Sequence, residues 1–306
     1  MSITSLLGAI EIGLIFSIMS LGIFITFRVL DFPDLTVDGS FTLGSVVGGV
    51  FALTGNPALG LLMAAIAGSI AGLATAFFHT KMKVNYILAG ILTMTGLYSI
   101  NLKIGGMPNF SLFGKTTVFS QFKSFIMNTL NINSGFIYDH YRLILIAIIV
   151  IILAILFNLF FKTQTGMAIR ATGDNEAMVR ASSINTDAMK IAGLMLANAL
   201  VALSAGLFTQ YQSFFDISTG IGMMVVGLSG IIIGESIFGK RTILNSLISI
   251  ILGAILYRII LAYALSLGMD PNDWKLLCAC LVILIISVPV IKDKINARRK
   301  RTYVRH

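Results

Sequence analysis

Long apolar runs separated by short polar stretches dominate the chain. A helix needs about 20 apolar residues to cross a bilayer. Seven runs meet that length, at residues 4–27, 57–79, 85–103, 142–161, 188–213, 242–266 and 273–291. Two shorter glycine-rich runs, 41–54 and 222–238, predict half-length or closely packed helices. The pattern therefore predicts an all-α polytopic membrane protein with eight or nine membrane segments, some of them short or broken.

The composition agrees with a chain that lies in lipid. Of its 306 residues, 57% are apolar and only 11% are charged, and the mean hydropathy is +0.92. A folded domain of this size cannot bury that much apolar surface within itself. The first run contains Glu11, lacks a basic leader and is longer than a signal-peptide core, so we expect it to be a retained membrane helix.

The distribution of Lys and Arg predicts the orientation. Basic residues gather at Arg28, 79–83, 162–190, 240–241 and in the tail 292–306, in alternate connections between the runs. The positive-inside rule places these stretches in the cytoplasm, with the C-terminus inside and the N-terminus outside. We therefore predict one transmembrane domain over 1–291, a long external loop over 104–141 and a basic cytoplasmic tail. The tail reads as a membrane flank, and we expect no nucleic-acid binding.

Two segments of the chain resemble each other. DLTVDGSFTLGSVVGGVFAL (34–53) can be laid against DISTGIGMMVVGLSGIIIGE (216–235), since each pairs an Asp with a short glycine-rich apolar segment. The predicted orientation starts one copy inside and the other outside. This arrangement indicates an inverted repeat of the kind found in transporters; a chance likeness of glycine-rich helices is the alternative.

The sequence offers little catalytic chemistry. The two cysteines stand at i and i+2 in KLLCACLVIL and point to different faces of a helix, and the histidines are scattered, so no metal site is expected. GESIFGKRT (234–242) nearly spells a phosphate-binding loop, but Arg replaces the Ser or Thr that would hold magnesium. We predict no catalytic residues, no cofactor and no enzymatic activity in this chain.

A few polar residues are candidates for lining or gating a path, because polar groups in membrane segments often mark function. Three of them lie in RVLDFPDLTVDGS, where Pro33 interrupts any regular helix. Irregular backbone at membrane depth must be buried in protein or line water, so 31–40 is predicted to line or gate the path. A plain cytoplasmic turn is the alternative, and for the last two candidates a helix–helix hydrogen bond. The candidates are Asp31, Asp34, Asp38, Asn198 and Gln210.

The polar block TGMAIRATGDNEAMVRASSI (165–184) interrupts the apolar runs near the middle of the chain. We expect Gly173 to end a helix that comes down from the membrane and Asp174 or Asn175 to cap a new one. Glu176 would favour the positive end of that helix. Asn185 or Thr186 would cap the next membrane helix. The block is thus predicted to be a short helix held crosswise between two membrane helices.

One side of this short helix is predicted to carry Ala177, Met178 and Ala181, with Arg180 on another side. Small and apolar knobs on a surface helix suit docking into a groove of a partner protein. An amphipathic helix lying on the lipid surface is the alternative. Its apolar face is small for that role, so we favour the partner.

The motif G-x-A-I-R-A-x-G-x-N at 166–175, followed by MLANALVALSAGLF, resembles the cytoplasmic coupling loop of ABC importer permeases. The closest group is the branched-chain amino acid and ribose permease family, and the resemblance covers roughly 10–290. DFPDLTVDGSFTLGSVVGG further resembles a subgroup described as tryptophan/tyrosine permeases. The chain departs from the family at 174–176, where a Pro often follows the Asn; a capping residue remains.

The resemblance implies a permease subunit in a bacterial cytoplasmic membrane. Two permease chains, as a homodimer, would form the path. Separate ATP-binding cassette ATPases would hold the helix at 174–182, and an external binding protein would dock near 104–141. The coupling loop would be 162–187, with Met178 as the knob and Arg170 and Arg180 facing an acidic partner surface. The full coupling set is Arg170, Gly173, Asp174, Asn175, Glu176, Ala177, Met178 and Arg180.

The subgroup resemblance implies import of amino acids, with aromatic ones favoured. Branched-chain amino acids or another small solute are the alternative substrates. A stand-alone secondary carrier and a membrane-embedded assembly protein are the alternative functions. The scarcity of charged residues along the helices argues against a proton-driven carrier.

Overall fold

The computed structural model describes residues 3–129 and 135–267, together with positions 276, 279, 280, 283 and 287. Within these residues, eight helical segments are long and apolar enough to cross a membrane. They are Ile3–Val29, Thr36–Leu53, Pro57–Thr80, Tyr86–Gly105, His140–Phe160, Thr186–Gln212, Ile217–Phe238 and Ile243–Ser266. This confirms the predicted helical, multiply spanning fold. The predicted span 273–291, apart from the positions just given, and the tail 292–306 lie outside the described residues.

The elements follow one another in this order: α1 (Ile3–Ile23), the π-helix η1 (Phe24–Val29), α2 (Thr36–Leu53), α3 (Pro57–Thr80), α4 (Tyr86–Gly105), β1 (Asn109–Ser111), α5 (Val118–Thr129), α6 (Gly135–Phe160), α7 (Gln164–Asp174), α8 (Glu176–Ala181), α9 (Thr186–Gln212), β2 (Phe214–Asp216), the 3-10 helix η2 (Ile217–Gly220), α10 (Met223–Phe238) and α11 (Ile243–Ser266).

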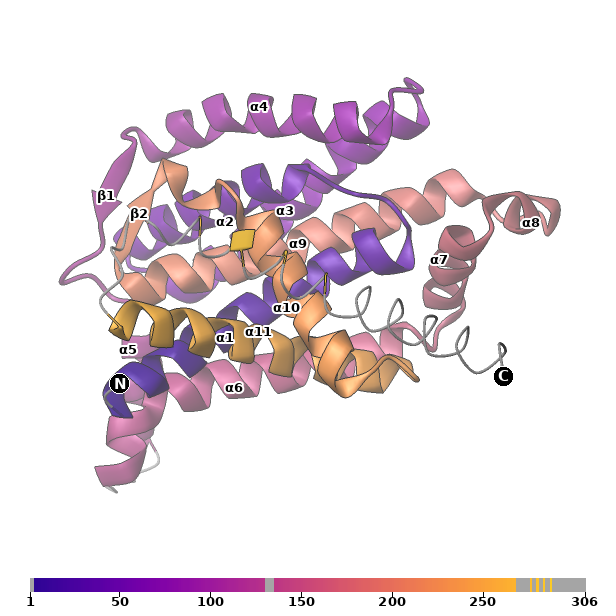
Figure 1. The fold of residues 1–306 in the computed structure, drawn as a ribbon. Helices are drawn as coiled ribbons and strands as arrows, with labels where there is room; N and C mark the ends of the chain where they lie inside the picture. The colour runs from indigo at the N-terminus through magenta and orange to yellow at the C-terminus, as the bar shows by residue number, and fades with distance from the viewer. Residues whose placement is uncertain are drawn as a thin grey trace, which may run out of the picture.

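The long helices run between two ends of the molecule (Figure 1). Helices α7 and α8 lie at one end, while β1, β2 and the N-terminus lie at the other. The first end gathers Arg28, Arg170, Lys240 and Arg241 around one cavity, and we call it the basic end. The other is called the opposite end. Three separate polar stretches thus bring their basic residues together, as the predicted orientation requires.

Helix α9 is the centre of the bundle and packs against α1, α2 and α3. Glycines allow these contacts to be close. A Cβ at Gly44 of α2 would collide with the backbone of Ala202, and one at Gly68 of α3 would collide with the backbone carbonyl of Asn198. These close approaches fix α2 and α3 against the core helix.

The non-helical segment around Pro33 is short and irregular. Only residues 30–35 lack helical structure, since α2 begins at Thr36 and not at 41. The expectation that 31–40 is irregular throughout is therefore wrong for its second half. Proline is tolerated just before a helix, where no intrahelical hydrogen bond is lost.

The prediction of a purely helical fold also misses a small sheet. At the opposite end, β1 and β2 pair antiparallel, with Phe110 facing Phe215. Their rings stack at 4.8 Å between centroids. The segment predicted as a loop over 104–141 holds β1, helix α5 and the start of α6. The pairing of β1 with β2 joins this segment to the connection between α9 and α10.

Candidate functional site

The polar block at the basic end forms two short helices joined by a capped corner. Thr163 begins α7 by accepting a hydrogen bond from the Gly166 amide at 3.2 Å. Asn175 has extended backbone and its Oδ1 accepts from the Met178 amide at 3.0 Å, so it ends α7 and caps α8. Asn185 caps α9 in the same way through the Ala188 amide. Of the two predicted caps at each corner, the asparagine is the one used, and Asp174 is the last residue of α7.

Gly173 has a different role from the predicted one. It does not end a helix; it lies within α7. A Cβ at this position would collide with the backbone carbonyl of Val29, at the end of η1. The glycine therefore lets α7 press directly on the backbone that ends the first span. A displacement of α7 would be passed to η1 without any intervening side chain.

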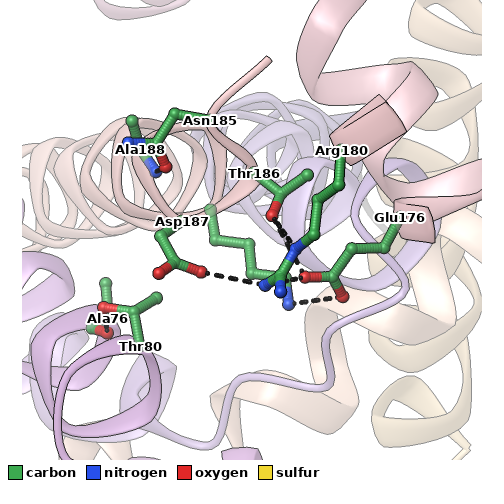
Figure 2. A network of polar contacts seen from close by, with 9 residues as sticks. Ala76, Thr80, Glu176, Arg180, Asn185, Thr186, Asp187 and Ala188 are labelled. Carbon is green, nitrogen blue, oxygen red and sulfur yellow. Dashed lines mark hydrogen bonds and ion pairs between the residues drawn. The ribbon is translucent and has the colours of Figure 1, made fainter. Parts of the chain in front are cut away.

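Five polar side chains hold α8 against α9 (Figure 2). Glu176 accepts from the Nη2 of Arg180 and from the Nζ of Lys190, each at 2.8 Å, and from the hydroxyl of Thr186 at 3.2 Å. The Nε of Arg180 also donates to that hydroxyl at 2.8 Å, and its Nη2 lies 3.3 Å from Asp187. The hydrogen bond from Lys190 is the main cause that lowers the pKa of Glu176. We call these five residues the α8–α9 network.

Arg180 forms its ion pairs within the chain. The resemblance implies that this side chain faces an acidic partner surface, yet among the described residues it forms ion pairs with Glu176 and Asp187 of the same molecule. Its guanidinium stays half exposed. In this structure Arg180 therefore positions α8.

The outer face of α8 is apolar and exposed. Ala177, Met178 and Ala181 all lie exposed, and 57% of Met178 is accessible. Val179 faces the other way and is 2% exposed, so it anchors the helix. Ala177, Met178 and Ala181 are thus exposed together, while Arg180 bonds back to α9. The anchoring role of Val179 was not predicted.

A second polar feature at the basic end is a cavity of about 330 Å³ between η1, α7 and the α10–α11 connection. Arg170 and Asp174 line it from α7, with Lys240 and Arg241 across from them. Arg28 lies in the same wall and makes a two-pronged ion pair with Glu235, at 3.1 and 2.7 Å. Arg170 is thus set among other cations.

Two of the five predicted path residues meet deep in the bundle. The Nδ2 of Asn198, near the middle of α9, donates to Oδ2 of Asp34 at 2.7 Å. The other oxygen of Asp34 accepts from the Thr36 amide at 2.9 Å. Asp34 and Asn198 are 1% and 0% exposed. The irregular segment therefore reaches the middle of α9, which excludes a plain surface turn at Asp34 and agrees with irregular backbone buried in protein.

The other three predicted path residues do not join this pair. Asp38 accepts from the amides of Gly222 and Met224 at 2.8 and 2.9 Å, and so caps α10, whose own N-cap glycine has no side chain to do so. Gln210 ties α9 to the first residue of α5 and to the first residue of α3. Asp31 is exposed, with a positive φ of 50°.

The two segments of the proposed internal repeat share one local hydrogen-bond pattern. Asp34 accepts from the amide two residues on, and Asp216 does the same with Ser218 at 2.6 Å. Each Asp stands at the same place in the two aligned segments. The helices that follow start beside each other at Asp38, and α10 runs from there to the basic end, where Glu235 meets Arg28. An inverted repeat predicts this arrangement.

Glu11, whose role the sequence left open, also has a partner. The hydroxyl of Tyr211 donates to Oε2 of Glu11 at 2.7 Å and ties α1 to the last turn of α9. The guanidinium of Arg142 lies over the Tyr211 ring at 5.6 Å. These contacts support a packing role at the opposite end.

Fold and site together define a multi-pass membrane protein with an exposed, rigidly held helix at its basic end. Comparison with known proteins gives the family. Residues 5–287 match the model of the branched-chain amino acid transport system permease component, and the chain belongs to this family. Its members are membrane subunits of ABC transporters. No solved structure matches significantly.

Two curated relatives cover almost the whole chain. The tyrosine transport system permease protein of Clostridioides difficile is 38% identical over 292 residues, which are 95% of this chain and 92% of the relative. The uncharacterized protein RP368 of Rickettsia prowazekii is 34% identical over 295 residues, 94% and 98% of the two chains. The autoinducer 2 import system permease protein LsrC of Escherichia coli K12 is 28% identical over 140 residues, 45% and 40% of the two chains.

Proposed function

We propose that this chain is the permease subunit of an ATP-driven importer of amino acids, with aromatic amino acids, tyrosine first, as its substrates. Membership of the permease family supports the transport role. The name of the Clostridioides difficile relative supports the substrate class. Separate ATP-binding cassette ATPases supply the energy, an external binding protein delivers the substrate, and a second copy of the chain completes the path.

The basic end faces the cytoplasm of a bacterial cell in this proposal. Its basic residues satisfy the positive-inside rule, and the proposal assigns the C-terminus to the cytoplasm as well. The opposite end, with β1, α5 and the β2 strand, faces the binding protein. Neither a metal nor a cofactor has a part in the permease.

Coupling takes place at α8, and the exposed Met178 on a helix that the α8–α9 network holds is the observation that carries this proposal. An apolar knob of this kind fits a groove on the ATPase. Arg180 keeps α8 in place from within the chain, and Ala177 leaves room for close approach. When ATP binding closes the ATPases, α8 moves with them.

The structure offers two routes for this movement. The first runs from Glu176 to Lys190 and thus into α9, which holds Asp34 through Asn198 midway along its length. The second runs from α7 through Gly173 to η1. Arg170 and Asp174 move with α7 in the wall of the basic cavity. Both routes end at the irregular segment 30–35, which we propose as the gate.

Uptake into proteoliposomes tests the transport function. Permease, ATPase and binding protein are reconstituted together, and uptake of labelled L-tyrosine is followed with and without ATP. We expect uptake that requires ATP and that L-phenylalanine inhibits more strongly than L-leucine. Stronger inhibition by L-leucine would move the substrate to branched-chain amino acids. Uptake by the permease alone would replace the proposal with a stand-alone carrier.

A further inference from the structure

A second cavity, of about 430 Å³, lies between α1, α9, β2, η2, α10 and α11. Its walls include Phe16, Phe208, Phe214, Asp216 and Arg258. Because Phe214 and Asp216 belong to β2, the cavity lies toward the opposite end of the bundle (Figure 1). Its volume falls within the range that small-molecule sites occupy.

Three aromatic rings line this cavity, those of Phe16, Phe208 and Phe214. Phe16 and Phe208 meet at 5.1 Å between centroids with their planes tilted by 46°. Phe214, at the edge, is 46% exposed. Aromatic rings favour a further aromatic ring in offset or edge-to-face contact. The wall therefore suits a flat aromatic side chain.

Two opposite charges line the same cavity. Arg258 stands within a candidate membrane span, where an ionised group is rare and often functional. Its guanidinium lies 5.3 Å above the Phe16 ring. Asp216 uses one carboxylate oxygen for the Ser218 amide. Among the described residues, no hydrogen bond to its second oxygen is found, so that oxygen can accept one from a ligand.

We propose that this cavity is a transit site for a zwitterionic aromatic amino acid. The α-carboxylate binds the Arg258 guanidinium, whose planar fork matches a carboxylate. The α-ammonium binds Asp216, and the ring packs against Phe16, Phe208 and Phe214. This inference rests on the proposed function and specifies where the substrate is held on its way through the permease.

The balance of charge distinguishes this cavity from the one at the basic end. Among the described residues that line it, one cation and one carboxylate match the two charges of an amino acid. The described residues that line the basic cavity include four cations and two carboxylates, which suits an anion. A lipid head group that carries an ammonium and a phosphate shares the two charges but lacks the ring, and the test separates it from an amino acid.

Saturation-transfer NMR on the purified full-length permease in detergent tests the site directly, because it detects weak binding and needs no ATPase. L-tyrosine is the probe. Tyramine lacks the carboxylate, 3-(4-hydroxyphenyl)propionate lacks the ammonium, and glycerophosphoethanolamine has the head-group charges without a ring. We expect transfer to L-tyrosine and about tenfold weaker binding of the other three, since a site built for a polar group rejects a ligand without it.

Variants assign the two charges. Asp216→Asn keeps an oxygen that can accept from the Ser218 amide but removes the negative charge. This variant should no longer bind L-tyrosine more tightly than 3-(4-hydroxyphenyl)propionate. Arg258→Gln should remove the preference over tyramine. Arg28→Gln takes away the same charge at the basic end and should leave L-tyrosine binding unchanged. Phe214→Ala removes a half-exposed ring from the cavity and should weaken L-tyrosine binding. Phe113→Ala removes a 90% exposed ring outside the cavity and should leave L-tyrosine binding unchanged.

The proposal is overturned if wild-type permease shows no transfer to L-tyrosine, or if glycerophosphoethanolamine competes as well as L-tyrosine. It is also overturned if Phe214→Ala and every folded charge variant bind L-tyrosine with unchanged selectivity. Failure of the importer function gives a different result: L-tyrosine binds the permease with the expected selectivity, but the ATPase drives no uptake.

Discussion

Lys190, in the second turn of α9, donates a hydrogen bond from its Nζ to Oε2 of Glu176, the first residue of α8, over 2.8 Å. Lys190 is largely buried, with 17% of its side chain exposed, and Glu176 is 36% exposed. The contact joins the short exposed helix to the helix at the centre of the bundle. A force applied to α8 therefore reaches α9 through a charged hydrogen bond, which is stronger than a neutral one.

This contact predicts a pH dependence of the α8–α9 connection. The pKa of Glu176 is lowered in the folded chain, from an ordinary value of 4.5, mainly by the Lys190 hydrogen bond. Its contribution is therefore complete above the unfolded pKa and is lost as pH falls through the folded pKa. Hydrogen exchange of 176–190 should be unchanged from pH 8 to about pH 5 after correction for the intrinsic rate, and should accelerate below about pH 4.

Glu176→Gln provides the control for that experiment. The amide cannot ionise, so exchange in this segment should be faster at neutral pH and should show no additional acceleration below pH 4. An acid-induced acceleration of the same size in Glu176→Gln would assign the pH dependence to another group.

Gly173→Ala should disrupt transport by displacing α7. The added methyl group would collide with the Val29 backbone, which cannot rotate away as a side chain could. We expect ATP-dependent uptake to fall about tenfold or more, because overpacking of about 1–3 kcal/mol acts on one of the two coupling routes. Gly96→Ala, in α4, is the matched control. A Cβ at Gly96 meets nothing within 4 Å, so normal uptake is expected there.

Asn198→Leu should destabilise the core of the bundle. The change removes a hydrogen bond to the buried Asp34 carboxylate and leaves that acceptor with fewer partners. A loss of about 1–3 kcal/mol is expected in the free energy of unfolding. Thermal unfolding in detergent measures it. In Asp34→Leu combined with Asn198→Leu, the loss should be less than the sum of the single changes; additive losses would show that the two side chains are not coupled.

Local signals in the sequence predicted a good part of this site. Asn175 and Asn185 were each one of two predicted caps, because a short polar side chain before a helical stretch satisfies free amides. The exposed face with Met178 followed from helical spacing. Long-range contacts were not predictable in this way. The Glu176–Lys190 and Asp34–Asn198 contacts join residues 14 and 164 positions apart, and no periodicity encodes such distances.

Two further differences have physical causes that one segment alone does not reveal. Gly173 looks like a helix breaker, yet it is a contact point with Val29 on another element. Asp38 was predicted as a path residue; that it also caps α10, whose N-cap is a glycine, was not predicted. Arg258 is not among the predicted path residues, although a single Arg in the apolar stretch ILYRIIL is itself a signal of function.

The central claim is that α8 is the contact through which an ATPase drives this permease. The direct measurement is affinity isolation of the chain from native membranes in mild detergent, with quantification of the proteins that accompany it. The wild-type chain should bring an ATP-binding cassette ATPase in about equal amount, and Met178→Asp should lose it while remaining inserted. Met82→Asp, at an equally exposed methionine in another connection, should retain it. An ATPase retained equally by Met178→Asp, or absent from the folded wild-type chain, would contradict the claim.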